Sequence, residues 1–565
     1  SALSVIIMSS SLSAQEPGSG AAEIEGLTGA KAERIGRLIE VWGFVKYHHA
    51  DALSGRMAMD QQFFDLYDNI DGAGSMQESD ALLADWLDRI GIGEPCNPCA
   101  GDNLSEADEI AIIQPTNSWI ATLPEPLALR AKAVFENRSS AAANFQIEPA
   151  RGVRNSQFFN EPDYKATGRD EPALRMLAVA RMWNALRYWF PYRDVMDDPV
   201  SEILQPAISE VLGAETQDAY KQALARFTTT SDDGHGVIMA YRSAISPSGD
   251  CFVPYTWRFV EGQLVVDGLQ SHSDGDLRRG DVVRAIAGKS VNDLAEHYGQ
   301  FLSASNEASR LNVLSSVLMQ GECGAHEVSV DRDGELATVS VEWLPRAESG
   351  LDFSRGPGRG GETIQALDGG FTYVRFSQLR RSDLDQLVET ANAGSGVVLD
   401  MRGYPRDFLV FALGGLLIDE PVEFARFTVP SPATPGLFTW TDPIALQPHA
   451  DGRRISAPVV ALIDENAASS PEYHAMAWRA AGVTLIGSPT AGADGNVSTM
   501  PLPLDGAGMR YSGIGVFYPD QQPTQRIGIV PDIMVKPTIE GISAGRDEPL
   551  ERALEELRSM KDEQP

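Results

Sequence analysis

Apolar positions along the chain follow three different patterns. In residues 31–225 they recur at helical spacing, and one helix face carries Ile35, Leu38, Ile39, Trp42 and Val45. Residues 250–345 include stretches in which apolar and polar positions alternate, as in strands with one buried face. From residue 371 onward, short apolar runs alternate with helical stretches. These patterns predict a mainly helical domain, a β-rich domain and an α/β domain, in that order.

The α/β region owes its prediction to short, strongly apolar runs. Residues 371–376, 397–401, 458–464 and 483–487 have the length and composition of buried strands. A helix is expected over 471–481, where Gly482 would end it, and an acidic helix over 548–560. Strands and helices in this alternation predict a layered α/β core.

Length and charge narrow the class of protein. A chain of 565 residues is too long for one hydrophobic core and suggests several domains. Its 46 basic and 79 acidic residues give a net charge of −33, which disfavours binding to nucleic acid or to an anionic membrane surface. Beyond the N-terminus no apolar run approaches the roughly 18 residues that a membrane-spanning helix needs.

The N-terminus predicts export. Residues 3–8 (LSVIIM) form a short apolar run, and Ser-Leu-Ser-Ala at 11–14 has the small residues of a secretory cleavage site. An ordinary frayed N-terminus is the alternative. The mature chain would begin near Gln15 and function in the periplasm or outside the cell. The Gly-, Ala- and Glu-rich residues 15–30 predict a disordered linker.

The four cysteines suit an oxidising compartment. An even number of cysteines in an exported protein favours disulfides, and four cysteines allow three pairings. We expect Cys96–Cys99 as a local loop staple and Cys251–Cys323 as the second bond. A redox motif at 96–99 is disfavoured because Gly91, Gly93 and Pro95 precede it in place of a strand. A zinc site would need a second ligand pair, and none occurs at suitable spacing.

The strongest candidate for chemistry is the segment 464–473 (DENAASSPEY), which joins a predicted buried strand to a helix. Ser470 suits the N-cap and Pro471 the first helical turn, so helix capping alone accounts for part of it. A serine at this junction lies beside free helix N–H groups and the positive end of the helix dipole. Both favour negative charge on a nearby oxygen, as an oxyanion hole does.

This segment resembles the C-terminal processing peptidases and tricorn-core serine peptidases. The similarity extends to residues 397–403, which end in Asp-x-Arg-Gly, to the Gly-x-x-Thr-x-Gly hairpin at 487–492 and to Gly-Ile-Val-Pro-Asp at 528–532. The resemblance implies a ClpP/crotonase-like α/β fold, a serine peptidase activity without a cofactor, and Ser469 as the nucleophile. Residues 280–294 (GDVVRAIAGKSVNDL) resemble the core of PDZ domains, which bind extended peptides by adding a strand to a sheet edge.

The general base follows from a departure within that resemblance. The processing-peptidase branch carries a lysine just after the Thr-x-Gly hairpin, where this chain has Ala493. The tricorn-like branch uses a histidine in an upstream segment rich in Asp and Gly, and His235 in residues 231–236 (SDDGHG) fits that role. A solvated turn is the alternative interpretation of this segment. His474 is nearer to Ser469 in sequence, but one helical turn in it is expected to point away.

The remaining site residues are implied by the same resemblance. The tricorn-like branch has a glutamate at the position of Gln525, and a glutamine can orient a histidine without balancing its charge. Asp232 or Asp233 is the alternative third member. The oxyanion donors would be the backbone N–H groups of Ser470 and of Gly403 or Tyr404, although Pro405 and Arg406 depart from the glycines usual in the family.

The combined prediction is a multi-domain α/β protein: an exported serine endopeptidase with Ser469 as nucleophile, His235 as base, Gln525 as orienting residue, no cofactor or metal, and polypeptides as partners. A weakly active or inactive peptide-binding protein on the same scaffold, and a hydrolase of esters or peptide conjugates, are the alternatives. The predicted boundaries are 1–14 for the signal remnant, 15–30 for the linker, 31–225 for the helical domain, 226–249 for the segment carrying His235, 250–345 for the PDZ-like domain and 346–565 for the α/β core with its C-terminal helix.

Overall fold

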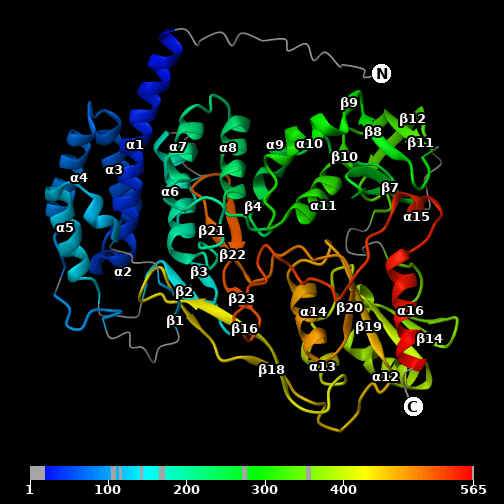
Figure 1. Ribbon diagram of the computed structural model, residues 1–565. Coiled ribbons are helices and arrows are strands. Elements are labelled where there is room, and N and C mark those ends of the chain that lie inside the picture. The colour runs from blue at the N-terminus through cyan, green and yellow to red at the C-terminus, as the bar shows by residue number, and fades with distance from the viewer. Residues whose placement is uncertain are drawn as a thin grey trace, which may run out of the picture.

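The computed structural model describes residues 19–93, 95–102, 110–113, 118–139, 144–164, 172–269, 277–351 and 358–562. Figure 1 shows three regions: helices of the N-terminal part at the left, a β-rich region at the upper right and an α/β region at the lower right. The signal sequence predicted for residues 1–14 lies outside the described residues. The mixed helix-and-sheet architecture confirms the predicted fold class.

The N-terminal region is mainly helical, as its apolar spacing predicted. Its helices are α1 (Ser19–His48), α2 (Ala50–Leu53), α3 (Met59–Asp71), α4 (Met76–Ile90), η1 (Ser118–Thr122), α5 (Glu125–Glu136), α6 (Pro172–Trp189), α7 (Leu204–Leu212) and α8 (Gln217–Thr229), and its strands are β1 (Ile110–Ile113), β2 (Ile147–Pro149) and β3 (Ser156–Phe158). Helix α1 begins at Ser19, within the segment predicted to be disordered. Alanine and glutamate favour helix, so the packed part of α1 extends into this stretch once it is nucleated.

A hairpin from the C-terminal half completes the core of the helical region. Strands β21 (Val497–Pro501) and β22 (Gly508–Ser512) pair with each other, and β22 also pairs with β4 (Val237–Ile238). Buried residues of the hairpin, among them Met500, Met509 and Tyr511, belong to the same hydrophobic cluster as α1, α3 and α6. In Figure 1 the two orange strands lie among helices coloured cyan and green. Segments about 300 residues apart in sequence therefore share one core.

The β-rich region forms a sheet of eight strands in the order β10-β5-β12-β11-β8-β7-β6, with β9 beside β8. Its elements are η3 (Met239–Tyr241), α9 (Arg242–Ile245), β5 (Cys251–Phe252), β6 (Tyr255–Val260), β7 (Gln263–Leu269), β8 (Val282–Ile286), β9 (Lys289–Ser290), α10 (Val291–Gly299), α11 (Glu307–Val317), β10 (Gln320–Gly321), β11 (Gly324–Arg332) and β12 (Glu335–Pro345). Strand β6 is an edge of this sheet, and helix α11 packs against it.

The α/β region is built on a six-stranded sheet in the order β13-β14-β15-β19-β20-β24. All neighbours are parallel except β13, which is antiparallel to β14. The sheet and its helices are β13 (Ile364–Leu367), β14 (Phe371–Arg375), η4 (Phe376–Gln378), η5 (Arg381–Asp383), α12 (Leu384–Ala393), β15 (Gly396–Asp400), α13 (Val410–Gly414), β19 (Val459–Ile463), α14 (Ser470–Ala480), β20 (Thr484–Gly487), β24 (Ile533–Met534), α15 (Ile539–Ser543) and α16 (Glu548–Asp562).

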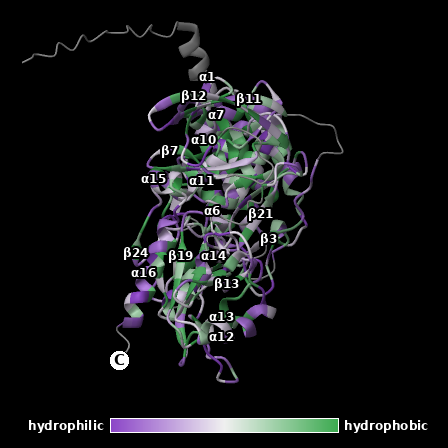
Figure 2. Cartoon of the chain, turned by 90° about the vertical axis from the view of Figure 1, so that its right-hand side faces the viewer, coloured by the Kyte–Doolittle hydropathy of each residue, from purple (hydrophilic) through white to green (hydrophobic). Residues whose placement is uncertain are grey.

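Helices cover both faces of this sheet. Alternate strand residues pack against α12, α13 and α14 on one face and against α16 on the other. Strands buried on both faces are strongly apolar along their whole length, which is why these runs predicted them. Figure 2 shows the result, with hydrophobic colour around β19 and hydrophilic bands on the outer helix α16.

A further sheet joins the helical and α/β regions. It contains β1, β16 (Val422–Pro430), β17 (Leu437–Trp440), β18 (Ile444–Leu446) and β23 (Gly515–Phe517). Two disulfides, Cys96–Cys99 and Cys251–Cys323, are present with the expected pairing. Within the described ranges, no helix has the length and hydrophobicity needed to cross a membrane.

Candidate active site

Ser469 occupies the tight turn between strand β19 and helix α14. Its backbone has φ 67° and ψ −118°, a left-handed conformation that non-glycine residues seldom adopt. Such strain costs on the order of 1–3 kcal/mol and persists only where surrounding contacts fix it. The turn places Ser469 at the N-terminus of α14, where the free N–H groups and the positive end of the helix dipole lie.

Glu472 is the group that holds this turn in place. Its side chain is fully buried and accepts hydrogen bonds from the Ser469 N–H (2.9 Å), the Thr490 hydroxyl (2.6 Å), and the N–H groups of Gly492 (2.8 Å) and Ala493 (3.0 Å). Burial raises the pKa of Glu472, while these donors act in the opposite direction. Glu472 thus links the serine turn to the hairpin at 490–493.

The loop after β15 brings Gly403 and Tyr404 to the same end of the sheet. Arg402 is buried and contacts Asp400 (2.6 Å) and Asp547 (2.8 Å), which anchors the start of the loop. Gly403 is buried, whereas the Tyr404 side chain is half exposed and its hydroxyl lies close to the Ser469 side chain. Burial, helped by the charge of Asp494, raises the pKa of Tyr404. The two loops that contain the predicted oxyanion donors therefore meet at Ser469.

His474 ties these two loops together and does not face the solvent. Its Nδ1 lies 2.6 Å from the Ser470 carbonyl oxygen, and its Nε2 accepts a hydrogen bond from the Leu409 N–H at 3.1 Å. The imidazole is therefore neutral, with the proton on Nδ1. Burial lowers the pKa of His474 to about 4, although the bond to Ser470 acts in the opposite direction. Both ring nitrogens are occupied by backbone groups, which favours His235 over His474 as the candidate base.

The segment that carries His235 packs against the hairpin segment at 490–493, which Glu472 links to the serine turn. Strand β4 follows His235 and pairs with β22, the hairpin strand that ends at Ser512. A Cβ placed on Gly234 would lie only 2.7 Å from the Cβ of Ala493, the residue whose N–H bonds Glu472. A larger side chain at position 493 would occupy the space of this backbone. A lysine at position 493, which the resemblance implies for the processing-peptidase branch, would therefore collide with the backbone segment that carries His235.

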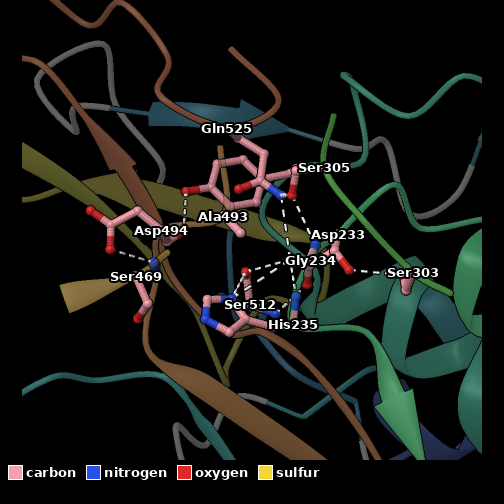
Figure 3. Close-up of polar contacts among 12 residues, drawn as sticks. Asp233, Gly234, His235, Ser303, Ser305, Ser469, Ala493, Asp494, Ser512 and Gln525 are labelled. Atoms are coloured by element: carbon pink, nitrogen blue, oxygen red, sulfur yellow. Dashed lines mark hydrogen bonds and ion pairs between the residues drawn. The ribbon is translucent and has the colours of Figure 1, made fainter. Parts of the chain in front are cut away.

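On its Nδ1 side, the imidazole of His235 contacts a serine, and that serine contacts a buried aspartate. Its Nδ1 is 2.9 Å from the Ser512 Oγ, and that hydroxyl donates to Asp233 Oδ1 at 2.8 Å. The direct separation between Nδ1 and Asp233 Oδ1 is 3.7 Å. Figure 3 shows the ring pointing toward Ser469.

Gln525 lies one contact away from the imidazole. Its amide nitrogen is 3.4 Å from Asp233 Oδ1 and 3.3 Å from Ser305 Oγ. The expected direct orientation of His235 by Gln525 is therefore replaced by a contact through Asp233. Asp232, the other acidic alternative, faces away, because its carboxylate accepts from the Asp197 N–H at 2.7 Å and lies 3.5 Å from Arg526.

Ser512 contacts His235 although no sequence motif marks it as a site residue. It is separated from His235 by 277 residues and lies at the end of an ordinary strand, with no motif around it. Only the pairing of β4 with β22 brings it beside the imidazole. Glu472, by contrast, sits three residues after Ser469, and its place in the first helical turn was a local signal. No group of three potential metal ligands occurs in the part of the chain that the structure describes.

A family model matches the part of the chain that contains Ser469. Residues 370–535, which include Ser469 and the hairpin at 490–493, match the model of peptidase family S41. Over these residues the chain is similar to peptidase family S41. The match confirms the resemblance of the α/β core and makes the chain a serine-type peptidase.

Solved structures share the fold of this peptidase at low identity. Mature CPAF complexed with lactacystin is 15% identical with a TM-score of 0.52, over 69% of this chain and 98% of that chain. A second structure of mature CPAF has the same identity and TM-score over 69% and 96% of the two chains. A third structure, of a CPAF mutant, is 14% identical with a TM-score of 0.53, over 69% of this chain and 96% of that chain. No curated protein matches the chain.

Proposed function

We propose that this serine-type peptidase is an exported endopeptidase in which Ser469 attacks the scissile carbonyl and His235 accepts and returns the proton. The observation that carries the proposal is the packing of Gly234 against Ala493, because Ala493 and Ser469 are both bonded to Glu472. This chain of contacts sets the His235 segment beside the serine turn. A histidine within reach of a serine can act first as base and then as acid.

The oxyanion would form where the two loops meet. The N–H of Ser470 at the start of α14 and that of Gly403 are the proposed donors, and the positive end of the α14 dipole favours the same charge. The Tyr404 hydroxyl lies beside the Ser469 side chain, so the substrate carbonyl would bind next to this phenol.

Extended polypeptide is the proposed substrate, and a groove beside the edge strand β6 supports this. The groove measures about 590 Å³ and lies between β6, helix α11 and the peptidase core; among its lining residues are Phe259, Leu311, Glu465, Pro489 and Arg526. A free strand edge offers main-chain hydrogen bonds to an added strand, which is how PDZ domains hold peptides. The groove reaches the segments that flank Ser469 and Gln525.

The two disulfides support export, because such bonds persist in oxidising compartments. The second candidate function, an inactive peptide-binding protein, is favoured by one observation: a glutamine occupies position 525, where the resemblance implies a glutamate. The groove along β6 would then be the functional site.

Labelling with a fluorophosphonate probe separates these functions. We expect the wild-type protein to be labelled, and the label to disappear in Ser469→Ala and in His235→Ala. His474→Gln serves as the control histidine and should still be labelled. Absence of label on folded wild-type protein would leave the binding function as the better account.

Peptide capture is tested separately on the Ser469→Ala protein, so that binding is measured without cleavage. Anisotropy of fluorescent unstructured peptides should show weaker binding when Leu311→Arg introduces a charge into the groove. Leu336→Arg is the matched control, because Leu336 is 80% exposed on strand β12, away from the groove. Equal affinity in both variants would exclude the groove as the binding site.

A further inference from the structure

Asp233 is a buried carboxylate, and no lysine or arginine among the described residues forms an ion pair with it. It is fully buried and accepts hydrogen bonds from two backbone N–H groups, those of Ser512 (2.6 Å) and His235 (3.1 Å). It also accepts from the Ser512 hydroxyl (2.8 Å) and the Gln525 side-chain amide (3.4 Å). Burial by itself would raise the pKa of Asp233, but the contacts with His235 and Ser512 outweigh it and the pKa is lowered. Asp233 is therefore ionised at neutral pH and acts only as an acceptor.

An ionised Asp233 fixes the direction of the hydrogen bonds that follow. A serine hydroxyl has one proton, and the Ser512 proton is donated to Asp233. The Ser512 oxygen can then only accept from His235, so the imidazole proton must lie on Nδ1. Neutral imidazole protonated on Nδ1 has its lone pair on Nε2, on the ring edge away from Ser512. That is the nitrogen a general base needs for the serine proton.

We propose that Asp233 and Ser512 are positioning residues for His235, with the Ser512 hydroxyl relaying the carboxylate's effect to Nδ1. This inference rests on the proposed function of Ser469 and His235. Asp233 thereby supplies the carboxylate that the resemblance implies at position 525, where this chain has a glutamine. When His235 takes the serine proton at Nε2, the imidazolium keeps its Nδ1 proton and Asp233 stays ionised, so charge is balanced across the relay without a second proton transfer.

Gln525 has a supporting part in this arrangement. Its amide donates to Asp233 and to Ser305, whose hydroxyl oxygen also accepts from the Gly234 N–H at 2.8 Å. A glutamate at 525 would place a second carboxylate about as close to Asp233 as the amide is now. Two adjacent buried carboxylates cannot both remain ionised, so Gln525→Glu should weaken the relay and should not improve it.

The rate constant for fluorophosphonate labelling of Ser469 tests the relay. We expect a loss of about 10–100-fold in Ser512→Ala, the range typical when a group that orients a reactive residue is removed. Ser512→Thr keeps a hydroxyl and should recover most of the rate. Ser498→Ala is the matched control, because Ser498 is buried on the adjacent strand β21 and its hydroxyl donates to the Ser156 carbonyl, outside the relay. This control should label at the wild-type rate.

Nitrogen NMR of the full chain labelled with 15N-histidine reports the tautomer of His235 independently of any catalysis. The His235 signals are assigned by their absence from His235→Ala. The wild type should show His235 protonated on Nδ1, and Ser512→Ala should shift it toward the Nε2-protonated form. A role confined to folding would leave this tautomer unchanged.

The outcomes separate the two proposals. Wild-type protein that is not labelled would overturn the function of Ser469 and His235 and the relay with it. Labelled wild type with an unchanged rate and an unchanged tautomer in Ser512→Ala would overturn the relay alone. A faster rate in Gln525→Glu would assign the acid to position 525 and overturn the part given to Asp233.

Discussion

The two halves of the candidate site are built in opposite ways. The nucleophile half is local: Ser469, Glu472 and His474 lie on one turn and one helix, and the strand before them is buried in a parallel sheet. The base half is assembled from distant parts, since His235 meets Ser512 across 277 residues and Gln525 meets Asp233 across 292. The nucleophile half is therefore fixed by its own segment, whereas the base half depends on how the regions pack.

The helical region is part of the base half. The hydroxyl of Tyr192, just after α6, donates to the Asp494 carbonyl at 3.0 Å and accepts from the Val516 N–H at 2.7 Å. Asp494 follows Ala493, so this tyrosine braces the segment against which Gly234 packs. A region that resembles no part of the peptidase motif thus supports the residue proposed as base.

The largest effect on the labelling rate is expected from a change at the contact between the two halves. Gly234→Ala would place a methyl group 2.7 Å from the Cβ of Ala493, which forces the His235 segment away from the serine turn. A displacement of about 1 Å at a reacting group can cost on the order of 100-fold in rate, and we expect a loss of that size in fluorophosphonate labelling. Gly360→Ala, which meets no atom within 4 Å, is the control. Equal labelling of both variants would show that the halves are not in contact.

The largest effect on stability should appear within the nucleophile half when the pH is lowered. The unfolded chain binds a proton at His474 near pH 6.5, whereas the folded protein does so only at about 4. This contribution to stability is complete above pH 6.5 and is lost as the pH falls to 4, by about 3 kcal/mol. Urea unfolding from pH 7 to 4 should therefore show a steeper decline for wild type than for His474→Gln. Parallel declines would contradict the buried neutral state of His474.

The smallest effect should come from the brace between the helical region and the base half. Tyr192→Phe leaves the ring in place but removes the hydroxyl that bonds Asp494 and Val516. We expect the free energy of unfolding to fall by about 1–2 kcal/mol, the usual loss for a buried hydrogen bond whose partner stays unsatisfied. Labelling of Ser469 should slow in the same variant. Tyr164→Phe, which loses a bond to Asp60 far from the site, should lower stability without slowing the label.

The same division explains what could be predicted from the sequence. The apolar runs predicted the α/β core, because a strand that is buried on both faces is apolar along nearly its whole length. The segment around Ser469 predicted a strand, a turn and a helix, and the structure has them there. Roles for Ser469, His235 and Gln525 remain predictions. The contact between Ser512 and His235 has no local signal, because it depends on the register between β4 and β22.

Because the β21–β22 hairpin is part of the helical core, this core can be completed only after the hairpin has been synthesised. Synthesis delivers the helical segments first, but their core lacks the hairpin residues until positions 497–512 have been made. The strand that pairs with β4 and carries Ser512 arrives in that same late segment. The contact between His235 and Ser512 can therefore form only after the chain has been synthesised as far as residue 512.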